Sequence, residues 1–316
     1  MASFAHMRFR LCATATPSPN DYTELGTHAE FLGICTRSEM LSEFFCHDGG
    51  ETQTWRLKGH ARAEFWRWVA SWGALVRSPA DLGYDSSSYA LPPLHVEQHN
   101  VPVDHVQVRA AGMLFAEHAR TLSERRNVRK ASIPARVAKV AELVRSNREQ
   151  WIIWNELNAE QDAVAKELGD ECVSIYGSLD SDEKESRYEQ WASGKARILV
   201  SKAAIFGYGI NMQFCSHMAF VGVTDSWENW HQAIRRCFRF GQTKPVYVHV
   251  FASELDSNVV ANLERKERDA MAMSEELARE AKAAVMAEVR GEMMPMVVKA
   301  ASRIEVPAWL RSESAA

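Results

Sequence analysis

The chain has 316 residues, of which 46% are hydrophobic and 25% are charged, and its formal net charge is −4. This composition is typical of a globular protein with room for two domains. The negative balance excludes a general attraction to nucleic acid, so any such binding requires a local basic patch. No apolar run approaches the roughly 20 residues of a membrane span, and residues 1–7 lack the apolar core of a secretory signal, so we expect no membrane partner.

The six cysteines lie far apart and form no C-x-x-C pair. Their spacing argues against a zinc ribbon and against a disulfide framework. We therefore expect no metal site and a reducing compartment, the cytoplasm.

The first 106 residues predict few regular elements. Residues 9–15 favour one buried strand that ends in the turn-forming sequence TPSPND, and a helix is expected at 21–31. Residues 46–60 are polar and contain glycine, and residues 78–106 are rich in Pro, Ser, His and Asp, so both predict loops or insertions.

An aromatic helix is predicted between these loops, at residues 61–76. Phe65, Trp68 and Trp72 recur there at i, i+3 and i+7. This spacing is typical of a buried helix face rather than of a platform on which bases stack.

Residues 118–148 carry nine basic side chains against two glutamates in an otherwise acidic chain. The basic residues are Arg120, Arg125, Arg126, Arg129, Lys130, Arg136, Lys139, Arg145 and Arg148. This excess indicates either a contact with a phosphate backbone or a solvated linker and helix face.

Short apolar runs alternate with amphipathic stretches from about residue 150 to 251. Strands are predicted at 151–154, 172–176, 198–201, 217–223 and 246–251, and helices at 160–168, 182–193 and 227–239. Strands that are apolar on both faces and alternate with helices predict a parallel sheet covered by helices on both sides. A long helix, rich in Ala, Glu, Lys and Arg, is expected from about 258 to 290.

The stretch Gln232–Gln242, with the sequence QAIRRCFRFGQ, carries the most functional information. If it is helical, Gln232, Arg236 and Arg239 project from one face, and Gly241 ends the helix. Guanidinium groups offer planar, bidentate donors to phosphate oxygens. The stretch therefore favours either the arginine finger of a motor ATPase or, more simply, a solvated basic helix face.

Residues 174–250 resemble the second motor domain of superfamily-two helicases, and most closely that of Swi/Snf-type DNA translocases. The motifs stand in the order of that family: Tyr176-Gly177-Ser178, then Arg187 and Trp191, then Gly207–Gln213 as motif V, then Asp225–Asn229 with Gln232–Gln242 as motif VI. A lone G-x-G is a weak signal, whereas several motifs in order are specific.

The N-terminal end extends this resemblance over most of residues 8–255. Leu11–Asn20 resembles helicase motif III, and its spelling is similar to that of phage and prophage members. This similarity implies the cytoplasm of a bacterial or phage-infected host cell. Arg77, Pro79 and the sequence Leu91-Pro92-Pro93 resemble the helical protrusion that these translocases insert between their two motor halves.

The resemblance implies an α/β fold, in which a RecA-like parallel sheet has helices on both faces. A mostly helical insertion would precede this domain and a long C-terminal helix would follow it. The implied division of the chain is a remnant of the first RecA-like motor domain at 1–33, an insertion or protrusion and linker at 34–130, the second RecA-like domain at 131–255, and a helical tail at 256–316.

Site residues follow from the resemblance by role. Arg239 would reach the γ-phosphate, with Arg236 beside it and Gln232 positioning both. Motif V would bind nucleotide or bring backbone close to DNA through Gly207, Gly209, Asn211 and Gln213. The candidate contacts to DNA phosphates are Ser201, Lys202, Arg129 and Lys130. Thr14 and Thr16 would couple nucleotide state to the grip on DNA.

Two departures from the family pattern lie inside motif VI. Arg235 stands where the family usually has an acidic residue, and Phe238 where it often has histidine. Neither departure removes the expected arginine finger, but both leave the pattern of hydrogen bonds around it undetermined by the sequence.

Such motors bind ATP and Mg²⁺ through a first domain that carries G-x-x-x-x-G-K-[ST] and an Asp-Glu pair. The phosphate loop does not occur in this sequence, and Gly194-Lys195 is no substitute because a hydroxyl residue does not follow. We therefore expect ATP and Mg²⁺ to serve a complete motor, the Mg²⁺ site to lie outside this chain, and the chain alone to hydrolyse no ATP.

Three functions stay open on the sequence. In the first, the chain is the C-terminal half of an ATP-dependent DNA helicase or translocase, which contacts the DNA backbone independently of sequence. Alternatively, it is a non-catalytic module that binds nucleic acid or a protein partner. The third alternative is one subunit of a split motor, whose N-terminal half is a separate chain.

Overall fold

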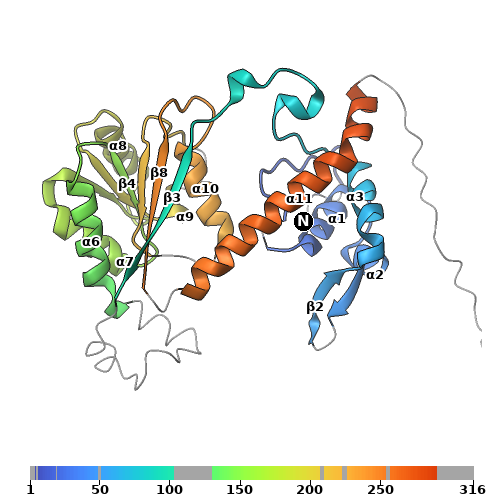
Figure 1. Ribbon diagram of the computed structural model, residues 1–316, viewed down its shortest axis with the longest axis horizontal. Helices are drawn as coiled ribbons and strands as arrows, with labels where there is room; N and C mark the ends of the chain where they lie inside the picture. Colours follow the sequence, from blue (N-terminus) through green and yellow to red (C-terminus); the bar gives the residue numbers. More distant parts are fainter. Residues whose placement is uncertain are drawn as a thin grey trace, which may run out of the picture.

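The computed structural model describes residue 4 and residues 6–18, 20–48, 51–102, 130–206, 210–222, 226–253 and 257–289. Within these residues the protein consists of an α/β domain and a helical lobe, which one long helix connects (Figure 1).

Six parallel strands form the sheet of the α/β domain, in the spatial order β3-β8-β7-β4-β6-β5. In chain order the strands are β3 (Leu94–Val101), β4 (Trp151–Trp154), β5 (Cys172–Ile175), β6 (Ile198–Ser201), β7 (His217–Phe220) and β8 (Val246–Ser253). Successive residues of a strand face opposite sides of the sheet. In β4, Trp151 and Ile153 therefore enter one core, while Ile152 and Trp154 enter the other.

Helices cover both faces of this sheet. One face carries α6 (Ile133–Arg145) and α7 (Asn158–Leu168), whose apolar residues pack on Trp151 and Ile153. The opposite face carries α8 (Ser181–Ala192), α9 (Ala203–Phe206) and α10 (Trp227–Cys237). A 3₁₀ turn, η7 (Gly169–Glu171), leads from α7 into β5. The parallel sheet predicted from the two-sided apolar runs is confirmed.

The helical lobe is built from α1 (Leu25–Leu32), α2 (Arg37–Phe44) and α3 (Arg62–Ala70), with an antiparallel hairpin of β1 (Phe45–Asp48) and β2 (Glu51–Leu57). Short 3₁₀ turns flank these elements: η2 (Tyr22–Glu24), η3 (Gly59–Ala61), η4 (Pro79–Leu82) and η5 (Ser87–Tyr89). The predicted aromatic face of α3 lies in the core of this lobe, where Phe65 is fully buried and Trp68 packs beside it.

The long helix α11 (Ser257–Val289) confirms the expected C-terminal helix and belongs to both cores. Val259 and Leu263 pack in the core beneath α10, whereas Met273 and Leu277 pack against the helical lobe. In Figure 1 it runs diagonally from the sheet to α3. None of the described helices, α11 included, is both long and apolar enough to cross a membrane.

Three expectations for the first hundred residues are wrong. Residues 9–15 form no strand, and Phe9 and Leu11 are 82% and 84% exposed. A strand needs a neighbour for its backbone hydrogen bonds, and no described strand lies beside this segment. The polar segment 46–60 contains most of the β1–β2 hairpin, and the segment 78–106 contains β3. Polar side chains are tolerated in β3 because it is an edge strand.

Candidate functional site

Two segments that the sequence marks as functional meet beside the C-terminal end of α10. They are residues 210–213, which follow α9, and residues 236–241, which end α10 and lead to β8. The N–H of Met212 donates to the carbonyl oxygen of Arg236 over 3.0 Å, so the backbones of the two segments are joined directly.

Helix α10 is capped at its start by Ser226, whose Oγ accepts from the N–H of Asn229 at 3.3 Å. Its apolar stripe of Trp227, Trp230 and Ile234 packs on the sheet. The helix ends at Cys237, four residues before Gly241, because Phe238 adopts φ −86° and ψ 77°. Arg239 therefore leaves the helix, and the expectation that it shares a helical face with Gln232 and Arg236 is wrong.

The two arginines of this stretch have different surroundings. Arg236 is almost fully buried, and its Nη1 donates to the carbonyl oxygen of Ile210 at 3.3 Å. Arg239 is half-buried, and its Nη1 donates to Oδ1 of Asn211. The backbone carbonyl of Asn211 also accepts from the hydroxyl of Tyr188 on α8, at 3.0 Å. Both arginines thus hold the segment 210–213 against α10.

Gln213 packs directly on Gly241. Gly241 has a φ of +93°, and a Cβ there would lie 3.3 Å from Nε2 of Gln213. The Oε1 atom of Gln213 is buried and has no hydrogen-bond partner among the described residues. This orphaned acceptor belongs to a side chain that packs on Gly241, two residues after Arg239, and it is the kind of atom that a bound donor would satisfy.

Gln242 closes the turn that follows α10. Its Nε2 donates to the carbonyl oxygens of Cys215 and Cys237 at 3.1 and 3.3 Å, and its Oε1 accepts from the N–H groups of Thr243 and Lys244. A buried glutamine with this many partners fixes the end of α10 relative to β7 and β8. The sequence stretch contained Gln242, but its spacing indicated no role for it.

The two departures in motif VI pack against each other. The guanidinium of Arg235 lies 5.3 Å from the centre of the Phe238 ring, and its Nε is 3.4 Å from Nε2 of His231. Burial, and then the positive charge of Arg235, lower the pKa of His231 to about 4. His231 is therefore neutral at pH 7. Gln232 is half-buried on the same helix, α10.

The candidates for DNA contact fall into three groups. Ser201 is fully buried in β6 and donates to the carbonyl oxygen of Ile175 at 3.0 Å, so its hydroxyl is used inside the core and its candidacy is withdrawn. Lys202 is half-buried just after β6, and Lys130 is exposed just before α6. Arg129, like Gly207 and Gly209 of motif V, lies outside the described residues.

The basic segment 118–148 is less available for binding phosphate groups than its composition indicates. Arg136 is fully buried: its Nη1 is 2.8 Å from Oε1 of Glu160 and also donates to the carbonyl oxygen of Val221, and its Nε donates to Ser132. Arg145 forms an exposed ion pair with Glu167 at 2.9 Å. Arg136 is therefore a core residue rather than a phosphate contact.

Gly222 lies directly on the buried ion pair. A Cβ at this position would be 2.6 Å from Oε1 of Glu160 and 3.0 Å from Nη1 of Arg136. The other carboxylate oxygen of Glu160 accepts from the N–H groups of Glu156 and Leu157, both at 3.0 Å. The ion pair thus joins the start of α7 to the residues that follow β7. The sequence offered no signal for this pairing, since the partners are 24 residues apart.

The structure places Thr14 and Thr16 in the N-terminal segment, near α11 rather than at the 210–213 segment. Oγ1 of Thr14 accepts from the N–H of Thr16 at 3.0 Å. Two residues later, Ser18 contacts Met273 of α11. Their coupling role stays a prediction.

The α/β domain is similar to known helicase domains. Residues 135–241 match the family model described as helicase conserved C-terminal domain. Among solved structures, the C-terminal part of the Fun30 ATPase domain is 13% identical, with 65% of this chain and 100% of that chain covered and a TM-score of 0.44. The C-terminal domain of the DEAD-box protein Dbp5 is 14% identical, with 57% and 87% covered and a TM-score of 0.40. No curated protein matches the sequence.

The match and the sheet agree on the fold. The six-stranded parallel sheet with helices on both faces is an α/β RecA-like fold, which is the fold of the helicase C-terminal domain family whose model residues 135–241 match. The long helix α11 follows this domain.

Proposed function

We propose that this chain supplies the second motor half of an ATP-dependent DNA helicase or translocase of the Swi/Snf type, and that Arg239 is its arginine finger. The contact between Arg239 and Asn211 carries the proposal. It brings together one residue from each of the two motifs to which the family resemblance assigns nucleotide contacts.

The surroundings of Arg239 support a ligand role. It lies outside the helix and is half-buried, and it donates a hydrogen bond to a neutral amide oxygen, Oδ1 of Asn211. A phosphate oxygen carries negative charge and accepts a stronger hydrogen bond from a guanidinium than an amide does. A bound nucleotide would therefore compete well for Arg239, and the buried Oε1 of Gln213 would accept a donor from the same ligand.

Arg236 has a different part in this proposal. Its burial and its bond to Ile210 make it a positioning residue, which holds the segment 210–213 where Arg239 can reach the ligand. Gln242 does the same for the turn that carries Arg239. Only the finger itself would then act on the transferred phosphoryl group.

ATP and Mg²⁺ would serve the complete motor. The phosphate loop that cradles ATP is not in this sequence, so the proposal requires a first motor half with that loop and with the Mg²⁺ ligands. DNA would be held through its backbone, independently of sequence, with Lys202 and Lys130 as the remaining described candidates on this chain.

The test is an ATPase assay with DNA, on this chain alone and mixed with a chain that supplies the first motor half. We expect no turnover by the chain alone and turnover by the mixture. Arg239→Ala should reduce that turnover by about 10³-fold or more, the usual contribution of an arginine finger. Arg235→Ala, in the last turn of the same α10, is the matched control and should retain activity.

Two outcomes would contradict the proposal. Turnover by the chain alone would show that its own residues complete the site. Equal losses in Arg239→Ala and Arg235→Ala would show that neither arginine acts as a finger. Salt-dependent DNA binding by a mixture that never hydrolyses ATP would favour a non-catalytic binding module instead.

A further inference from the structure

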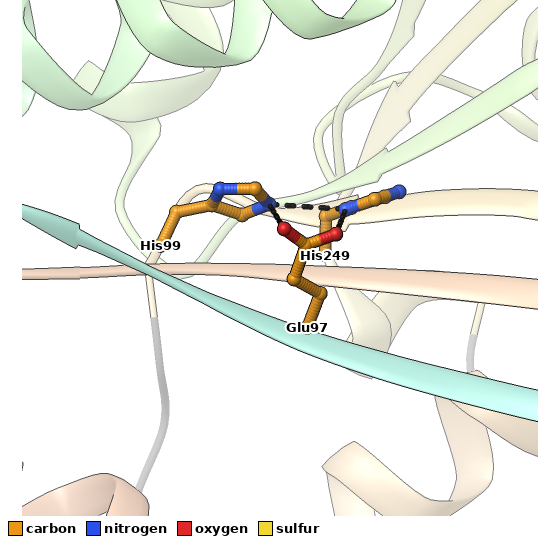
Figure 2. Close-up of side chains that lie close together, drawn as sticks. All are labelled: Glu97, His99 and His249. Atoms are coloured by element: carbon orange, nitrogen blue, oxygen red, sulfur yellow. Dashed lines mark hydrogen bonds and ion pairs between the residues drawn. The ribbon is translucent and has the colours of Figure 1, made fainter.

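Glu97, His99 and His249 gather on the face of the sheet that α6 and α7 cover, at its β3 edge (Figure 2). Glu97 and His99 are two residues apart on β3, so their side chains leave the strand on the same side. His249 stands on β8 directly opposite Glu97 in the parallel register. The pairing of the two strands therefore fixes all three side chains in one place.

The donor atoms of the three side chains lie close to one another. Nε2 of His99 is 3.0 Å from Nδ1 of His249, Oε2 of Glu97 is 3.4 Å from Nδ1 of His249, and Oε1 of Glu97 is 3.9 Å from Nε2 of His99. Figure 2 shows the three groups converging on one point. In the ordinary interpretation, one proton bridges the two imidazoles and the glutamate lies beside them.

These separations also fit a bound metal ion. Two ligands at about 2.05 Å from a tetrahedral Zn²⁺ are separated by about 3.3 Å. The three distances, 3.0, 3.4 and 3.9 Å, lie on both sides of this value, so shifts of a few tenths of an ångström would complete the geometry. Two histidines and one carboxylate leave a fourth position for water.

Aromatic rings lie against both imidazoles. The ring of Phe251 stacks on His99 at 4.5 Å, and Trp151 lies 5.6 Å from His249. Apolar walls of this kind hold the rings and exclude water from one side.

The site also has an entrance. The side chain of Glu97 is 64% exposed, whereas those of His99 and His249 are 24% and 11% exposed. An ion would therefore meet the carboxylate first and then displace the proton between the imidazoles. Burial of the imidazoles does not require Glu97, because they already bond to each other.

We propose that Glu97, His99 and His249 form a binding site for a divalent transition metal ion, with Zn²⁺ as the best fit. Nitrogen and carboxylate ligands at this spacing suit Zn²⁺ better than Mg²⁺ or Ca²⁺, which prefer all-oxygen shells. The bound ion would join the edge strand β3 to β8. This inference does not depend on the proposed motor function.

The test is calorimetric titration of the full chain with Zn²⁺ alone, at neutral pH. We expect one ion per chain, with release of protons that makes the measured heat depend on the buffer. Glu97→Gln and His99→Gln should each weaken binding by at least about tenfold. Glu97→Gln is the sharper variant, because this exposed side chain contributes little to the fold.

His95→Gln is the matched control. His95 lies on the same strand and points to the same side, and its ring stacks on Tyr247 at 5.0 Å. This variant should bind Zn²⁺ as the wild type does. The proposal is overturned if the wild type takes up no Zn²⁺, if either ligand variant binds as tightly as the wild type, or if His95→Gln weakens binding as much as they do.

Thermal unfolding supplies a second readout. Zn²⁺ binds the folded chain, so it should raise the melting temperature of the wild type and of His95→Gln. It should raise the melting temperature of Glu97→Gln by less at the same concentration, because that variant binds the ion more weakly, although without metal it unfolds at the temperature of the wild type. An equal rise in Glu97→Gln would place the ion elsewhere and overturn the proposal.

Discussion

Arg136 and Arg239 each hold a loop of the α/β domain, one on either face of the sheet, and they do so in opposite ways. Arg136 is fully buried and spends its donors on Glu160, Ser132 and the carbonyl of Val221. Arg239 is half-buried and bonds to the neutral side chain of Asn211. Sequence alone presents both as members of basic stretches, so burial and the charge of the partner distinguish them.

The difference separates a structural arginine from one that can exchange partners. A buried guanidinium that loses its carboxylate leaves an uncompensated charge in the core, which is costly. A half-exposed guanidinium that loses an amide returns to water at little cost. We therefore expect changes at Arg136 to act on stability and changes at Arg239 to act on ligand binding.

The largest effect should come from the carboxylate of the buried pair. Glu160→Ala should lower the free energy of unfolding by about 3–5 kcal/mol, because it leaves Arg136 buried without its counter-charge. Glu167→Ala is the matched control, since Glu167 is also on α7 and pairs with an arginine of α6, but at the surface. It should cost less than about 1 kcal/mol in urea denaturation. Equal costs would remove the contrast between buried and exposed pairs.

Gly222→Ala tests the Arg136–Glu160 ion pair by adding a methyl group to the glycine that lies against it. The added Cβ would lie 2.6 Å from Oε1 of Glu160, so the ion pair or the loop must shift, and we expect a loss of about 1–3 kcal/mol of unfolding free energy. At Gly59 no heavy atom of the described residues lies within 4 Å of an added Cβ, so Gly59→Ala should change stability little. A neutral Gly222→Ala would mean that the loop after β7 is not held against Glu160.

His231, on α10, extends the comparison to a half-buried side chain that is neutral at pH 7. Its pKa falls from 6.5 to about 4 on folding, so between these values the unfolded chain binds the proton and the folded chain does not. Stability should therefore decrease as pH falls from 7, by about 1 kcal/mol at pH 5.5 from this group. His231→Gln should remove that part of the pH dependence of urea denaturation. An unchanged slope would show that the imidazole is already protonated in the fold.

The smallest effect on stability should come from Arg239. Arg239→Ala should change the free energy of unfolding by less than about 0.5 kcal/mol, because the contact with Asn211 is half-exposed and neutral. Circular dichroism during denaturation measures this directly. A loss above about 2 kcal/mol would make Arg239 a structural residue like Arg136 and weaken its assignment as a finger.

The fold was predictable where burial is two-sided. The apolar runs WIIW and ILVS could only lie in a covered parallel sheet, and β4 and β6 formed there. β3 escaped prediction because an edge strand needs fewer apolar residues, and its sequence LHVEQHNV resembles a loop. For residues 9–15 the error was the opposite one: a strand was predicted and none formed, because an apolar run without a neighbouring strand stays exposed.

The candidate site was predictable in its membership and not in its geometry. Spacing along the chain brought out Arg236 and Arg239, and the family resemblance brought out Asn211; in the structure Arg236 bonds to Ile210 and Arg239 bonds to Asn211. The helical periodicity that placed both arginines on one face did not hold, because the backbone turns at Phe238. Contacts between distant segments, such as Glu97 with His249, required the strand register and are invisible to spacing.

Helix α11 is anchored at one end in the core beneath α10 and further along in the helical lobe, so it connects the two cores rigidly. From Leu263, in the core beneath α10, to Leu277, in the helical lobe, the helix rises about 21 Å. A tilt of about 10° at the first anchor would displace the second by about 4 Å, more than half a helical turn. A small rearrangement at the end of α10 would therefore be transmitted by rotation of α11 to the aromatic core of the helical lobe. No chain of side-chain contacts between the two cores is needed for this transmission.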